Sequence, residues 1–223
     1  MNKHLERVNP VKSSKYIPCC LLFILMIKAS FPVYSQDASL IQETYVKKEY
    51  RIEMRDGVKL HTIVYAPVDS SETYPILLYR TPYSIRPYGD EMRASLSTNE
   101  WLARDRYIFV FQDVRGKFMS GGQYVNMRPV LDVYNSSADI DETTDTWDTV
   151  DWLVKNIGNN NGKVGMYGVS YPGFYTVMGT INAHPAMVCT SPQAPISDWF
   201  LMAPLISGTS YWNILIMIGS GNP

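Results

Sequence analysis

The sequence predicts an α/β fold in which an antiparallel hairpin precedes a mostly parallel sheet. Three observations lead to it: an Asp-Gly turn between two alternating segments, short apolar runs of strand length, and amphipathic segments between those runs. With 46% hydrophobic and 18% charged residues, the 223-residue chain is apolar enough to bury a core. Strands that alternate with helices are typical of a parallel sheet covered on both faces.

The N-terminal residues are typical of a secretory signal. Basic residues precede an apolar run from Ile17 to Ile27, and small or weakly polar residues follow up to Ser35. The run is shorter than the roughly 20 residues that a membrane-spanning helix needs. We therefore expect a signal peptide over residues 1–35 and a secreted or periplasmic protein that meets the membrane only through this signal.

The hairpin is predicted at the start of the mature chain. Residues alternate from Tyr45 to Met54, turn at Asp56 and Gly57, and resume from Val58 to Ala66. An Asp-Gly pair supplies the positive φ that a tight hairpin turn requires.

Four apolar runs of strand length and two helical segments follow. We expect strands at Ile76–Tyr79, Tyr107–Gln112, Lys163–Tyr167 and Met187–Thr190. Helices are expected at Asp145–Lys155, where apolar residues recur at helical spacing, and at Pro172–Ala183. The first two runs have the composition of buried parallel strands.

The segment from Gly165 to Gly173 carries the strongest functional signal. Ser170 stands between a predicted strand and a predicted helix, with glycines on both sides, which is the arrangement of a nucleophile elbow and predicts an α/β-hydrolase fold. Gly168 would let strand and helix approach closely, and Pro172 suits the first turn of a helix. The general motif has glycine where Pro172 stands, and a Gly-Ser turn without chemistry is the alternative interpretation.

Several segments resemble the CocE/NonD hydrolases, which include Xaa-Pro dipeptidyl-peptidases, α-amino-acid ester hydrolases and cephalosporin acylases. Residues 168–173 read Gly-Val-Ser-Tyr-Pro-Gly and are similar to the Gly-x-Ser-Tyr-x-Gly elbow of that family. The likeness extends roughly from Tyr45 to Phe200. Further blocks agree in the same order, at Arg80–Tyr83, Asp113–Gly116, Asp145–Lys155 and His184–Trp199.

The resemblance implies roles for three residues. Ser170 would be the nucleophile, the phenol of Tyr83 would donate to the oxyanion, and the backbone N–H of Tyr171 would be the second donor. The substrates would be small esters, amides or short peptides, cleaved through an acyl-enzyme. A tyrosine that merely packs in a loop is the alternative for Tyr83. The family's ester hydrolases for α-amino acids have a carboxylate just after this tyrosine, where Ser84 and Ile85 stand here.

A general base for Ser170 is not evident. The histidines are His4 in the signal, His61 in the hairpin and His184 at the end of the predicted second helix. The resemblance places the triad Asp and His beyond residue 200, outside this chain. We therefore expect residues 36–200 to be the N-terminal part of a catalytic domain, with a sheet that is incomplete at its C-terminal end.

The same reasoning makes residues 201–223 the start of a cap region or an aberrant tail. The chain as it stands would then be an inactive part of a serine hydrolase. Two alternatives stay open: a dipeptidyl-peptidase that acts on Xaa-Pro peptides, and a non-catalytic remnant that lacks the triad His and Asp.

Composition excludes several other classes of function. The chain has 20 Lys plus Arg against 21 Asp plus Glu, so no net charge would attract nucleic acid. It has neither a phosphate loop, nor a dinucleotide fingerprint, nor cysteines and histidines at zinc spacing. We expect no cofactor, no metal and no nucleic-acid partner, and we leave homo-oligomerisation open.

Overall fold

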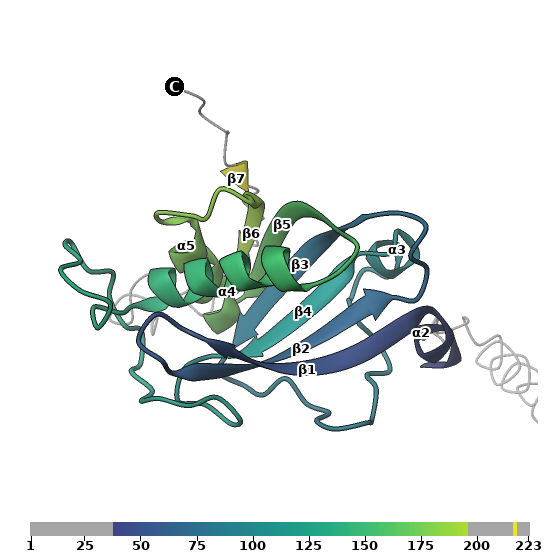
Figure 1. Cartoon of the computed structure of the whole chain (residues 1–223), viewed down its shortest axis with the longest axis horizontal. Helices are drawn as coiled ribbons and strands as arrows, with labels where there is room; N and C mark the ends of the chain where they lie inside the picture. Colours follow the sequence, from purple (N-terminus) through teal and green to yellow (C-terminus); the bar gives the residue numbers. More distant parts are fainter. Residues whose placement is uncertain (1–37, 196–215, 218–223) are drawn as a thin grey trace, which may run out of the picture. The chain divides into compact units, whose positions relative to one another are not determined.

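A computed structural model describes residues 38–195 and 216–217 of the chain. These residues form a seven-stranded mixed sheet in the order β1-β2-β4-β3-β5-β6-β7 (Figure 1). The strands are β1 (Tyr45–Glu53), β2 (Lys59–Pro67), β3 (Tyr74–Thr81), β4 (Ile108–Asp113), β5 (Asn160–Val169), β6 (Met187–Gln193) and β7 (Ile216–Met217). The helices are α2 (Ala38–Thr44), α3 (Glu100–Arg104), α4 (Glu142–Asn156) and α5 (Tyr171–Thr180).

The predicted hairpin is confirmed as β1 and β2. These strands pair antiparallel, with Arg51 opposite His61. Gly57 has φ +83° in the turn and donates a 2.8 Å hydrogen bond to the carbonyl oxygen of Met54. Strand β2 also pairs antiparallel with β4, which joins the hairpin to the parallel part of the sheet.

The parallel part of the sheet consists of β4, β3, β5 and β6. Strand β3 pairs parallel with β4 on one side and with β5 on the other, and β5 pairs parallel with β6. All four predicted strands are therefore confirmed, with bounds that differ by a few residues because backbone pairing continues beyond the apolar runs. The carboxyl ends of these strands meet at one edge of the sheet.

The two faces of the sheet are covered differently. Helices α4 and α5 pack on one face and lie in front of the sheet in Figure 1. On the other face, Ile85 and Leu96 from the segment between β3 and α3 pack with Ile41 of α2 against Phe109 and Phe111. Both faces of the sheet are therefore covered, as expected, the second one by a long loop and two short helices.

Helix α4 begins earlier than its apolar periodicity indicates. Asp141 is its N-cap, and its carboxylate accepts a hydrogen bond from the backbone N–H of Thr144, whose hydroxyl accepts one from the N–H of Asp141. This capping box stabilises a polar first turn that precedes the predicted start at Asp145. Helix α5 ends at Thr180 rather than Ala183, so His184 lies in the following loop and does not end the helix.

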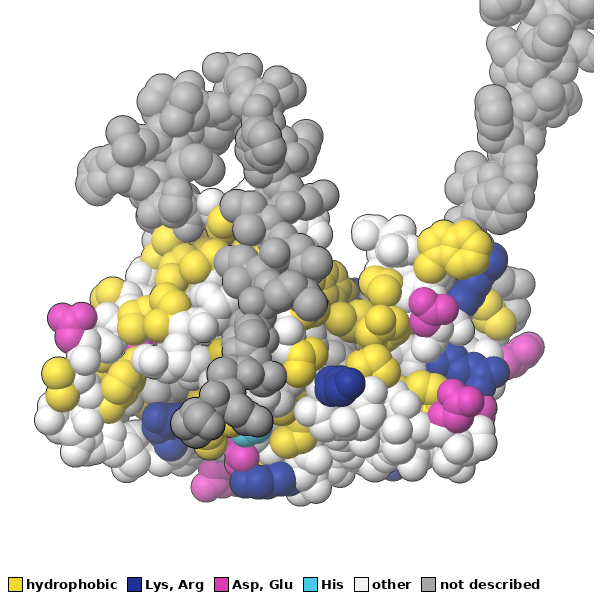
Figure 2. Space-filling model, turned by 90° about the horizontal axis from the view of Figure 1, so that it is seen from above, with side chains coloured by type: hydrophobic (Ala, Val, Ile, Leu, Met, Phe, Trp, Pro, Cys, Tyr) yellow, Lys and Arg dark blue, Asp and Glu magenta, His cyan; other side chains and the backbone are white. Residues whose placement is uncertain are grey.

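Some sequence features lie outside the described residues. They are the predicted signal peptide at 1–35 and, apart from β7, the predicted tail at 201–223. Within the described part of the chain, no helix is long and apolar enough to cross a membrane. Seen from above, the surface carries hydrophobic side chains over its middle and charged ones mostly toward its rim (Figure 2).

Candidate active site

Ser170 occupies a strained turn between β5 and α5. Its backbone has φ +61° and ψ −120°, a region that residues with a side chain rarely adopt. Two hydrogen bonds hold it there: the N–H of Ser170 donates to the carbonyl oxygen of Gln193 at 3.0 Å, and its carbonyl accepts from the N–H of Phe174 at 3.1 Å. Ser170 is exposed at the end of β5, as a nucleophile elbow requires.

Two glycines make this turn sterically feasible. A Cβ on Gly168 would lie 2.3 Å from the carbonyl oxygen of Pro172, so the predicted close approach of strand and helix at this position is observed. A Cβ on Gly173 would lie 2.7 Å from the carbonyl oxygen of Gln193. The glycine that follows the nucleophile is therefore needed where α5 passes β6, one residue later than in the general motif.

Tyr171 contributes both its backbone and its side chain to the site. Its N–H is at the N-terminus of α5, where the helix dipole is positive and favours a developing negative charge. Its phenol, which sequence analysis did not consider, lies 2.7 Å from the hydroxyl of Tyr124 and accepts a 3.0 Å hydrogen bond from the N–H of Met127. Burial, together with the hydrogen bond between the hydroxyls of Tyr124 and Tyr171, raises the pKa of Tyr124 to about 12.

Tyr83 lies beside the elbow in the loop that follows β3. Its ring meets the ring of Tyr171 edge to face, with centroids 6.1 Å apart, and its side chain is 63% exposed. Its N–H donates to the hydroxyl of Thr81 at 3.1 Å. The structure thus brings together the three residues that the resemblance selected, and the exposed phenol remains available to a ligand.

Asp113 holds the loop that carries Tyr83. This residue is fully buried at the end of β4, and its carboxylate accepts hydrogen bonds from the N–H of Ile85 at 3.1 Å and from the hydroxyl of Tyr88 at 2.9 Å. Burial raises the pKa of the Asp113 carboxyl. Farther along the loop, the ammonium of Lys47 donates to the carbonyl oxygens of three alternate residues, Pro87, Gly89 and Glu91.

A cavity of about 480 Å³ opens beside the elbow, at the carboxyl ends of β3, β5 and β6. Its size suits a small organic ligand. One side of the cavity is lined by Val169, which precedes Ser170 in the sequence, and by Gln193, whose carbonyl oxygen accepts the hydrogen bond from the N–H of Ser170. Other lining residues are aromatic, hydroxylic or basic, namely Tyr79, Thr81, Tyr83, Ser84, Arg93, Ser95, Leu96, Ser97, Thr98, Phe111 and Tyr167.

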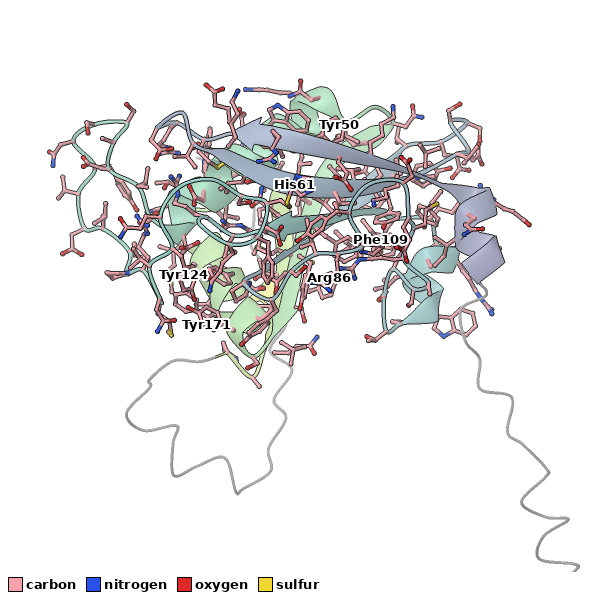
Figure 3. All side chains as sticks on the ribbon, turned by 90° about the horizontal axis from the view of Figure 1, so that it is seen from below. Tyr50, His61, Arg86, Phe109, Tyr124 and Tyr171 are labelled. Carbon is pink, nitrogen blue, oxygen red and sulfur yellow. The ribbon has the colours of Figure 1, made fainter. Side chains whose placement is uncertain are left out.

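The two histidines in the described residues are engaged away from Ser170. His61 is buried on β2, with Nε2 3.2 Å from a carboxylate oxygen of Glu49, and burial lowers its pKa. Figure 3 shows His61 well apart from Tyr171, the neighbour of Ser170. His184 packs its ring on Trp147, with centroids 4.7 Å apart, and its Nδ1 accepts a hydrogen bond from the N–H of Ala186. Within the described residues, no group of three His, Cys, Asp or Glu side chains is arranged to hold a metal ion.

Similar proteins are hydrolases with this architecture. Cocaine esterase from Rhodococcus sp. (strain MB1 Bresler) is 29% identical over 183 residues, which are 79% of this chain and 29% of that protein. The structure of an α-amino acid ester hydrolase is 45% identical with a TM-score of 0.61, and that of an aminopeptidase from a marine sediment Thaumarchaeota archaeon is 44% identical with a TM-score of 0.62. In both, 70% of this chain matches 26% of the other.

These coverages mean that the chain spans less than a third of the length of these relatives. The predicted α/β-hydrolase fold is confirmed by the same structural matches. The family of X-Pro dipeptidyl-peptidases (S15 family) matches residues 56–212, a range that contains the turn of the hairpin, the loop after β3, the cavity and the elbow. The chain therefore belongs to the X-Pro dipeptidyl-peptidase (S15) family.

Proposed function

We propose that this chain carries the nucleophile and the oxyanion donors of a serine hydrolase that cleaves esters or amides. The strained conformation of Ser170 is the observation on which this proposal depends, since φ +61° in a non-glycine residue costs energy and is typically retained at functional sites. Its exposed hydroxyl, the adjacent helix N-terminus and the neighbouring cavity are what an acyl transfer requires.

The reaction would proceed through an acyl-enzyme. The hydroxyl oxygen of Ser170 attacks the carbonyl carbon while its proton passes to a general base, and the carbonyl oxygen becomes an oxyanion. The phenol of Tyr83 and the N–H of Tyr171 donate hydrogen bonds to that oxyanion. The carbonyl re-forms as the alcohol or amine leaves with a proton, and water then attacks the acyl-enzyme and releases the acid.

The general base comes from outside the described residues. His61 and His184 have other partners, and a serine hydroxyl stays protonated at neutral pH without a base. Without it, the oxyanion donors alone would give only a residual rate enhancement, on the order of 1,000-fold over water.

Two substrate classes follow from the relatives. Small esters or amides are our first choice. The family's ester hydrolases for α-amino acids have a carboxylate just after the oxyanion tyrosine, and this chain has Ser84 there, whose hydroxyl lies 3.0 Å from that of Tyr88. Selectivity for α-amino acyl groups is therefore not part of the proposal. Cleavage after Xaa-Pro is the second, because the matching family consists of X-Pro dipeptidyl-peptidases. Rates on a nitrophenyl ester and on an Xaa-Pro nitroanilide distinguish the two.

We also propose export from the cytoplasm, directed by residues 1–35. Support comes from the basic residues and the apolar run that precede Ser35. N-terminal sequencing of the protein from its native host should find a mature chain that begins near Gln36, and an intact Met1 on the exported protein would contradict the proposal.

The nucleophile is tested in the longest polypeptide that the gene encodes. We expect a fluorophosphonate probe to label it, and Ser170→Ala to abolish both labelling and ester hydrolysis while thermal unfolding stays the same. Ser71→Ala, in an exposed turn, is the matched control and should behave as the unaltered protein. Labelling that survives in Ser170→Ala would show that another residue is the nucleophile.

A further inference from the structure

Arg93 brings a half-buried positive charge to the wall of the cavity. It lies in the segment between β3 and α3, and its guanidinium carbon is 4.1 Å from the centroid of the Phe111 ring. Its Nη2 donates a 3.1 Å hydrogen bond to the carbonyl oxygen of Ile85. These contacts fix the planar group against the aromatic wall and leave its other nitrogens for other partners.

The guanidinium of Arg93 has no counterion among the residues that the structure describes. No carboxylate in this part of the chain forms an ion pair with it, and its Nε is buried without a hydrogen-bond partner. Its pKa is lowered by burial, which the nearby phenols of Tyr65 and Tyr167 partly offset. A charge that is partly removed from water without a partner is costly, so a ligand that supplies the opposite charge would be bound favourably.

The rest of the cavity indicates what kind of molecule would supply that charge. Its walls include the rings of Tyr79, Phe111 and Tyr167 and the side chain of Leu96, which suit an aromatic or aliphatic body. No acidic side chain lines it, while Ser95, Ser97 and Thr98 offer hydroxyls. The planar fork of an arginine matches the two oxygens of a carboxylate better than it matches a single acceptor.

We propose that Arg93 binds a carboxylate on the group of the substrate that fills this cavity. The favoured substrates would then be esters or amides in which an apolar or aromatic group bears one carboxylate. The claim that the bound acid is part of a substrate rests on the proposed function. The anion site itself depends on Arg93 and the cavity, and does not require Ser170 to react.

Binding of simple acids tests the site without catalysis. With the purified chain, we expect benzoate to bind at least about 10-fold more tightly than its neutral analogue benzamide, measured by calorimetry at low salt. Arg93→Gln should remove this preference and leave benzamide binding unchanged, whereas Arg93→Lys, which keeps the charge but not the fork, should retain part of it. Arg51→Gln, on an exposed position of β1, is the control and should retain all of it.

The outcomes separate this inference from the proposed function. Equal affinity for benzoate and benzamide, or a preference that persists in Arg93→Gln, would overturn the anion site. If Arg93→Gln does not fold, the comparison of the two ligands in the unaltered chain and in Arg93→Lys decides. Ser170→Ala should bind benzoate as the unaltered chain does, so a failure of the nucleophile assignment leaves this result intact.

Hydrolysis then shows which side of the scissile bond occupies the cavity. In the longest encoded polypeptide, nitrophenyl hydrogen succinate is compared with nitrophenyl butyrate for a carboxylate on the acyl group. The acetyl ester of 4-hydroxybenzoate is compared with phenyl acetate for one on the leaving group. We expect one pair to show a kcat/KM preference of about 10-fold or more for the acid, lost in Arg93→Gln. Hydrolysis without such a preference in either pair would overturn the substrate claim.

Discussion

Arg80, at the end of β3, and Arg93, in the loop that also carries Tyr83, both have guanidinium groups removed from bulk water, and the surroundings of these groups differ. Arg80, on β3, is fully buried under α4, where Nη1 lies 3.6 Å from a carboxylate oxygen of Glu142 and Nη2 lies 3.8 Å from one of Asp145. Arg93 reaches the cavity and has no carboxylate partner among the described residues. A charge whose partners are built into the fold stabilises it, whereas a charge left without one beside a cavity is available to a ligand.

The charges around Arg80 continue into a network that anchors α4. Nε of Arg80 donates to the side-chain oxygen of Gln112 at 2.8 Å. Asp145 accepts a 2.6 Å hydrogen bond from Nη2 of Arg115, whose Nη1 donates at 2.6 Å to Asp56 in the hairpin turn. The polar first turn of α4 is thereby tied to β3, to β4 and to the hairpin.

The largest expected effect is the loss of stability when Arg80 is replaced. At pH 8, where Glu142 is largely ionised, Arg80→Gln leaves Glu142 and Asp145 buried without a full counterion, which should lower the free energy of unfolding by about 3–5 kcal/mol. Arg93→Gln, the matched replacement, should change it by less than about 1 kcal/mol. Urea denaturation of both variants measures the contrast, and similar losses would mean that Arg93 too is a structural residue.

The network also predicts a pH dependence of stability. Burial raises the pKa of Glu142 from 4.5 to about 7 in the folded protein, so the folded state holds this proton more tightly than the unfolded state. The free energy of unfolding should therefore fall as pH rises from about 4.5 to about 7, by up to about 3 kcal/mol.

Glu142→Gln isolates this contribution, because buried Asp113 also has a raised pKa and adds a slope of the same sign. The variant should lose most of the pH dependence that the unaltered protein shows, and it should be the more stable of the two at pH 8. Parallel stability curves for the two proteins would instead assign the ionised form of Glu142 to the folded state.

Among the residues near the cavity, the glycine at the elbow is the one whose substitution we expect to lower stability. Gly168→Ala puts a methyl group 2.3 Å from a backbone oxygen, so strand and helix must separate, at about 1–3 kcal/mol. At Gly158, which has no atom within 4 Å of the added Cβ, the same replacement should cost less than about 1 kcal/mol. Thermal unfolding of both variants provides the comparison, and equal shifts would contradict close packing at the elbow.

The smallest effect on stability is expected at Tyr83, which is 63% exposed. Tyr83→Phe should change the free energy of unfolding by less than about 0.5 kcal/mol. In the longest encoded polypeptide it should lower kcat about 100-fold with a lesser effect on KM, because the phenol would act mainly in the transition state. An unchanged kcat would place the oxyanion donor elsewhere.

Sequence reasoning predicted the features that depend on local pattern. The hairpin follows from one Asp-Gly turn, the strands from apolar runs, and the elbow from a serine between glycines at a strand-to-helix junction. It placed the start of α4 too late, because the buried polar residues of its first turn have partners on distant strands that no periodicity shows.

The site shows the same division. Ser170 has a local signal, whereas Tyr83 was selected only through the family resemblance. Arg93 and the phenol of Tyr171 were missed, because their significance depends on Phe111 and Tyr124, residues far away in the chain. The sequence offers no local signal for either contact.

The attachments of the loop after β3 have a thermodynamic consequence. Asp113 holds the beginning of this loop and Lys47 its middle, and the loop carries both Tyr83 and Arg93. Its conformational entropy is therefore lost when the protein folds rather than when a ligand arrives, which leaves more of the contact energy for affinity. Since one segment presents both side chains, loosening either attachment would weaken oxyanion stabilisation and anion binding together.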